Sequence, residues 1–123
     1  MKKIMCAVLF AATALTAWAA QAQEPPQDAL PAGVVQRGTL ADPRLRHDAL
    51  MGALATVSAW GCNKPETMAP YMLALPTGEV GQREWQERWM INGCGRQYAV
   101  DIRFHESGPS KGTDWTILNK LNP

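Results

Sequence analysis

Two tryptophans and a carboxylate occupy alternating positions, Trp85, Glu87 and Trp89, in the second half of this 123-residue chain. On a β-strand the three side chains would share one face, because successive side chains point to opposite sides. Two open indole rings on one face could stack on a sugar ring or a murein fragment. Large aromatic side chains are more often buried, however, and we therefore favour core packing for both tryptophans.

Core packing of the two tryptophans makes Glu87 an anomaly, because the carboxylate then points inward with them. Burial of an unpaired charge is costly. Arg46 is a matching oddity, since it falls within the apolar arc of the helix predicted below. We therefore expect Glu87 to pair with Arg46 across the helix–sheet interface, or its side chain to extend to the edge of that interface. A catalytic role for Glu87 lacks a partner carboxylate.

A second set of candidate residues, Arg103 and His105, lies on the polar side of a predicted strand together with Asp101. No third metal ligand follows at a defined spacing, so we predict a solvated surface and no metal site. We recognise no Ser-His-Asp triad, phosphate-binding loop or haem attachment motif in the sequence. We therefore expect no cofactor and no enzymatic activity, and treat Arg103 and His105 as candidate partner contacts.

The first 22 residues have the features of a cleavable signal peptide. Lys2 and Lys3 form a positive start, an apolar run follows from Ile4 to Ala20, and Ala20-Gln21-Ala22 is a small-x-small cleavage site. The run is short for a membrane span and is followed by polar residues. We expect the mature protein to be periplasmic or secreted, without a membrane span.

Cleavage leaves two cysteines, Cys62 and Cys94, because Cys6 lies in the leader. An even pair in an oxidising compartment typically forms a disulfide. Neither cysteine lies in a Cys-x-x-Cys motif, which favours a structural bond over a redox or metal site. Closing this loop is worth about 3–4 kcal/mol relative to the unfolded chain.

The charge of the mature chain bears on its partners. Cleavage removes two of the 12 basic residues and none of the 11 acidic ones, which leaves a formal charge of −1. No basic surplus remains to neutralise phosphates, so we do not expect nucleic acid as a partner.

A flexible linker and then a helix are predicted after the leader. Residues 23–41 are rich in proline and glycine and show no periodicity, which indicates a linker. Asp42-Pro43 is a good helix start, and Gly61 a good stop. Apolar residues between them recur on one side of the helical wheel, with Gly52 on the polar side. The apolar side comprises Leu45, Ala49, Leu50, Ala53, Leu54, Val57 and Trp60.

Four strands are predicted after the helix. Residues 97–104 alternate most clearly between apolar and polar, and residues 83–91 alternate around the two tryptophans. The turn Asn92-Gly93-Cys94-Gly95 joins these two strands into a hairpin. Shorter strands are predicted over residues 68–75 and 113–118.

These elements predict a single α+β domain over residues 42–123. An N-terminal helix would pack on one face of a four-stranded antiparallel meander sheet, and the disulfide would tie the helix end to the central hairpin. We expect a non-enzymatic binding or inhibitory module for a protein or envelope partner. Its contacts would be a sheet edge, the loop of residues 107–112 or the polar strand face. The alternative is a carbohydrate or murein-fragment binder that uses exposed Trp85 and Trp89.

Overall fold

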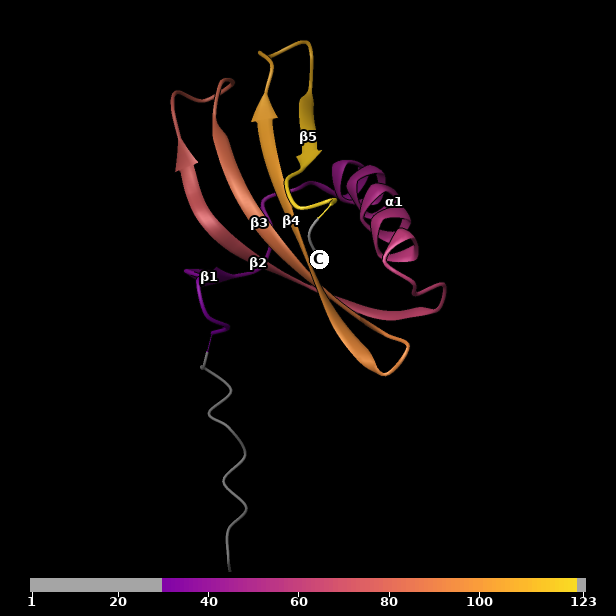
Figure 1. Cartoon of the computed structure of the whole chain (residues 1–123). Helices are drawn as coiled ribbons and strands as arrows, with labels where there is room; N and C mark the ends of the chain where they lie inside the picture. The colour runs from indigo at the N-terminus through magenta and orange to yellow at the C-terminus, as the bar shows by residue number, and fades with distance from the viewer. Residues whose placement is uncertain (1–29, 122–123) are drawn as a thin grey trace, which may run out of the picture.

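The computed structural model of the chain describes residues 30–121, so the predicted signal peptide and the start of the predicted linker lie outside the described residues. The described chain forms one helix and five strands (Figure 1). In chain order the elements are β1 (Gln36–Arg37), α1 (Pro43–Ala59), β2 (Pro65–Thr77), β3 (Glu84–Gly93), β4 (Arg96–Glu106) and β5 (Thr113–Ile117).

The strands form one antiparallel sheet in the order β1-β2-β3-β4-β5. The sheet is strongly curved, and α1 lies against its concave side (Figure 1). The predicted α+β class and the meander that follows the helix are confirmed, but the sheet has a fifth strand.

The fifth strand, β1, precedes the helix. Gln36 pairs with Met72 and Arg37 with Tyr71, and the backbone N–H of Val35 donates to the carbonyl of Met72 over 2.9 Å. The prediction of a flexible linker is therefore wrong for this part of residues 23–41. A strand of two residues is too short to show a period of two, and the sequence carries no other sign of it.

The helix begins and ends where the sequence predicts. The Asp42 carboxylate accepts from the Leu45 N–H over 2.8 Å, and Gly61 takes a φ of 108° just past the helix end. Its predicted apolar side faces the sheet, with Ala49 and Ala53 fully buried.

Gly52 departs from the predicted helical wheel, because it lies in the interface and not on the solvent side. A Cβ atom at this position would lie 2.3 Å from the Trp115 ring of β5. Glycine at this position therefore gives the Trp115 ring room to lie against the helix.

The core lies between α1 and the concave face of the sheet. Alternate residues of β3 and β4 supply most of it, as a half-buried antiparallel sheet requires. The largest fully buried apolar side chains are Trp89, Phe104, Met72, Ile91, Ile102, Val57 and Val100, and Trp85 is 4 % exposed beside them.

The disulfide lies at the end of the sheet formed by the β3–β4 hairpin, which is lowest in Figure 1. Cys62 and Cys94 are bonded, with their Cα atoms 5.8 Å apart, as predicted. Cys94 and Gly95 form the two-residue turn between β3 and β4 with φ values of 55° and 69°. Positive φ at both positions is typical of a type I′ hairpin turn. The bond therefore joins this turn to the end of α1.

Candidate functional site

The alternating triplet of β3 lies inside the core. Trp85 is 4 % exposed, while Trp89 and Glu87 are fully buried. Phe104 of β4 stacks on Trp85, with ring centroids 5.3 Å apart. The alternative of an exposed tryptophan platform for carbohydrate is therefore wrong, because neither ring presents a face to solvent.

Glu87 is held by its two tryptophan neighbours. The Trp85 indole N–H donates to one carboxylate oxygen over 2.9 Å, and the Trp89 indole N–H donates to the other over 3.3 Å. The expected pairing with Arg46 is wrong, because Arg46 is exposed and Glu87 makes no ion pair within the described residues. Two buried indole donors need an acceptor, and one carboxylate satisfies both.

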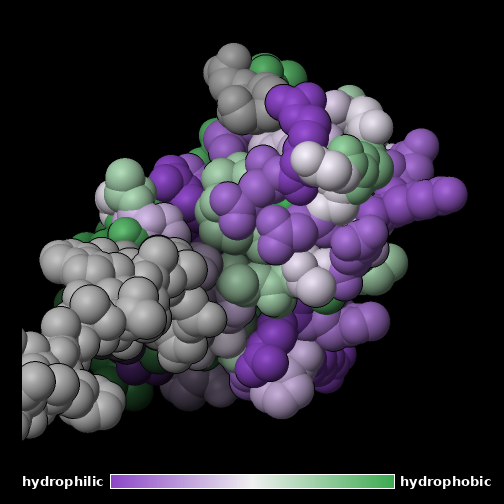
Figure 2. All heavy atoms as spheres, turned by 90° about the horizontal axis from the view of Figure 1, so that it is seen from below, coloured by the Kyte–Doolittle hydropathy of each residue, from purple (hydrophilic) through white to green (hydrophobic). Residues whose placement is uncertain are grey.

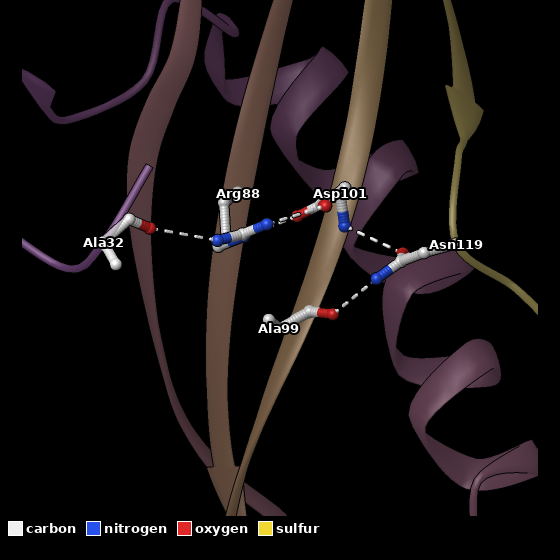
Figure 3. Close-up of polar contacts among 5 residues, drawn as sticks. All are labelled: Ala32, Arg88, Ala99, Asp101 and Asn119. Atoms are coloured by element: carbon white, nitrogen blue, oxygen red, sulfur yellow. Dashed lines mark hydrogen bonds and ion pairs between the residues drawn. The ribbon is translucent and has the colours of Figure 1, made fainter. Parts of the chain in front are cut away.

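The convex face of the sheet is polar, and an arginine lies at its centre. Arg88 binds Asp101 through two hydrogen bonds of 2.7 and 3.0 Å, and its third nitrogen donates to the Ala32 carbonyl over 3.3 Å (Figure 3). The hydrogen bond to Asp101 raises the pKa of Arg88. This residue therefore attaches the segment before β1 to the middle of the sheet.

Asn119 continues the same row of contacts toward the C-terminus. Its amide accepts from the Asp101 N–H over 3.0 Å and donates to the Ala99 carbonyl over 2.9 Å (Figure 3). The side chain thus takes the place of a strand where β5 has ended. The centre of the polar face is occupied by contacts within the protein, which disfavours it as a ligand site.

The predicted contact residues Arg103 and His105 lie on the same face, nearer its upper end. Arg103 forms an ion pair with Glu84 over 3.3 Å, and both side chains are about half exposed. His105 is exposed between Glu84 and Asp114, its neighbours in the sheet. Within residues 30–121, no three His, Cys, Asp or Glu residues are grouped as metal ligands.

Two hairpin loops meet at the upper end of the sheet (Figure 1). One joins β2 to β3 and the other joins β4 to β5. The Gly108 N–H of the second loop donates to the Gly81 carbonyl of the first over 2.8 Å. We call residues 78–82 and 107–112 together the loop end.

An arginine–glutamate pair fixes the base of the loop end. The Arg83 guanidinium hydrogen-bonds Glu106, the Arg83 N–H donates to the same carboxylate over 3.1 Å, and the Glu106 N–H donates to the Arg83 carbonyl over 2.9 Å. The hydrogen bond from Arg83 lowers the pKa of Glu106. The two loops are thereby held in one arrangement.

The loop end exposes apolar side chains. Val80, at the tip of the first loop, is 87 % exposed, and Leu75, outside the loop end and two residues before the end of β2, is 54 % exposed. Pro109 of the second loop is also exposed, and a Cβ atom at Gly81 would lie 3.9 Å from its Cδ atom. The loop of residues 107–112 was among the predicted contacts, whereas Val80 was missed. The sequence feature that indicates Val80 is the position of an apolar residue between two glycines, Gly78 and Gly81.

The opposite end of the molecule lacks such a feature. Figure 2 views the protein from the β3–β4 hairpin, and hydrophilic residues make up much of the surface turned to the viewer. None of the large exposed hydrophobic residues in the described part of the chain lies between residues 92 and 97. The candidate site is therefore the loop end.

Comparison of the chain with protein-family models, curated proteins and solved structures finds no match. In the described part of the chain, no helix has the length and hydrophobicity that crossing a membrane requires.

Proposed function

We propose that the protein is an exported, non-enzymatic binding or inhibitory module, and that the loop end carries Val80 into an apolar recess of a protein partner. The observation that carries this proposal is the exposure of Val80, 87 %, on a loop that is hydrogen-bonded to its neighbour. An apolar residue displayed on a preformed support loses little conformational entropy on binding.

The rest of the molecule supports this assignment over the other predicted surfaces. Trp85 and Trp89 are buried, and the centre of the polar face is engaged by Arg88 and Asn119. The potentially catalytic carboxylate, Glu87, is closed off from solvent between two indoles.

Site-specific photo-crosslinking tests the proposed surface. A photoreactive amino acid at position 80 should give a crosslinked protein partner in cell-envelope extract, and excess unlabelled protein should compete it away. The matched control carries the same group at Arg96, an exposed position in the opposite hairpin. Equal crosslinking from both positions, or none that competes from position 80, would contradict the proposal.

Export has a separate test. N-terminal sequencing of the protein recovered from the periplasm or the medium should begin at Gln23, the residue after the predicted cleavage site. Recovery of a chain that still begins at Met1 would contradict export with cleavage.

A further inference from the structure

The free edge of β5 has unpaired backbone groups. In its ladder with β4, the Leu118 N–H donates to the Asp101 carbonyl, and the Ser107 N–H to the Gly112 carbonyl. Because inward and outward groups alternate in an antiparallel pair, the N–H and C=O groups of Thr113, Trp115 and Ile117 point away from β4. No other described residue forms a backbone hydrogen bond with them.

A groove of about 390 Å³ lies beside this edge, between β5 and α1. Trp115 and Ile117 line it on the strand side. On the helix side the lining comes from one row of small residues, Gly52, Ala55, Thr56 and Ala59. A strand added to β5 would project every second side chain into this groove, and the small residues leave room for it.

The charges around the edge indicate what such a strand would carry. Lys111 precedes β5 and Lys120 follows it, and both are exposed. Neither lysine forms an ion pair within residues 30–121. Lys120 and the 92 % exposed Leu121 also line the groove. An apolar segment with acidic ends complements this arrangement.

We propose that the β5 edge and its groove bind an extended segment of another protein, apolar at alternate positions and acidic at its ends. Strand addition to an exposed edge is a general mode of peptide recognition, in which backbone bonds give affinity and alternate side chains give specificity. A second copy of this chain fits less well. Antiparallel pairing of two β5 edges centred on Trp115 would bring Lys111 of one copy close to Lys120 of the other.

A synthetic peptide of the form Asp-Glu-Val-Thr-Val-Thr-Val-Glu-Asp, labelled for fluorescence anisotropy, tests the proposal on the whole protein. The acidic peptide should bind saturably, and more weakly as salt is added. A peptide with lysine in place of each acidic residue should bind at least several-fold more weakly. Equal binding of the two peptides would overturn the proposed charge preference, and no saturable binding would overturn the site.

Variants of the protein locate the peptide. Lys120→Glu should weaken binding of the acidic peptide by about 5-fold, the range of an exposed charge pair. Lys64→Glu makes the same change in net charge away from the groove and should have little effect. Ala55→Gln fills the groove from an exposed helix position and should abolish binding, whereas Met51→Gln, on the same helix outside the groove, should not.

Two results would overturn the assignment to this edge. The first is full binding by Ala55→Gln when circular dichroism shows that the variant is folded. The second is a concentration-dependent dimer in sedimentation that Ala55→Gln dissociates, because the groove would then serve self-association. The Val80 crosslink does not depend on either result, since position 80 lies in the loop between β2 and β3 and does not line the groove.

Discussion

The two ends of the sheet are closed by different means. At the lower end a disulfide joins the turn of β3 and β4 to the segment just after α1. The backbone is closely packed there, since a Cβ atom at Gly93 would lie 2.6 Å from the Lys64 carbonyl oxygen. At the loop end, hydrogen bonds and the Arg83–Glu106 ion pair hold two loops together, and Val80 remains exposed. The lower end is therefore closed covalently, whereas the other end is held by non-covalent contacts and presents an apolar side chain to solvent.

Among substitutions at the two ends, removal of the disulfide should have the largest effect on stability. The double variant Cys62→Ser, Cys94→Ser should lose about 3–4 kcal/mol of unfolding free energy, because the unfolded chain is no longer cross-linked. Urea denaturation monitored by tryptophan fluorescence measures the loss. An unchanged urea midpoint would mean that the lower end does not carry the stability assigned to it.

Glu87→Gln should have the next largest effect on the unfolding free energy. Glu87 lies in the core that connects the two ends of the sheet. An amide offers one oxygen, so one of the two indole N–H groups would lose its acceptor at a cost of about 1–3 kcal/mol. Glu84→Gln, at an exposed position of the same strand, is the matched control and should change stability by less than about 0.5 kcal/mol. Equal effects of the two substitutions in thermal unfolding would contradict the role given to Glu87.

Acidification should weaken the contacts that hold the loop end together and leave the disulfide-linked lower end unchanged. The pKa of Glu106 is lowered in the folded protein from its usual 4.5, so the stability that the ion pair contributes is present above that pH and lost as the pH falls through the folded pKa. After correction for intrinsic rates, acidification should therefore lower the protection from hydrogen exchange more at the Gly108 amide than in the disulfide-linked hairpin.

Glu106→Gln should remove this pH dependence at the loop end. Glu79→Gln, an exposed position in the adjacent loop, should retain it. If the wild-type protein and Glu106→Gln show the same protection profile between neutral and acidic pH, the ion pair does not hold the two loops together.

Val80→Ser should have the smallest effect on stability and a large one on binding. The side chain is exposed, so the unfolding free energy should change by less than about 0.5 kcal/mol. Loss of an apolar contact at the centre of an interface typically costs more than about 1 kcal/mol of binding free energy. A partner captured through position 80 should thus be bound several-fold more weakly in calorimetry by a variant of unchanged melting temperature.

Much of the fold could be predicted because its elements are long enough to show a period. The alternation in β3 and β4, the Asp42-Pro43 start of α1 and the pairing of Cys62 with Cys94 each have a local physical cause. β1 could not be predicted in this way, because its existence depends on the partner strand β2 and not on its own residues.

The candidate site was harder to predict, because it depends on which residues the sheet brings together. The sequence shows that Glu87 points inward, but not that two indole N–H groups on its own strand would satisfy it. Gly52 likewise appears solvated on a helical wheel until Trp115 is placed across from it. Contacts between distant segments have no signature in a single sequence.

The bond from Arg88 to the Ala32 carbonyl has a mechanical consequence for the segment before β1. Tension on this segment at Ala32 passes into the bidentate Arg88–Asp101 pair across β3 and β4. Such a load acts on the middle of the sheet and bypasses both the two upper loops and the edge of β5. A pull on this segment is therefore borne by the middle of the sheet, away from both proposed contact surfaces.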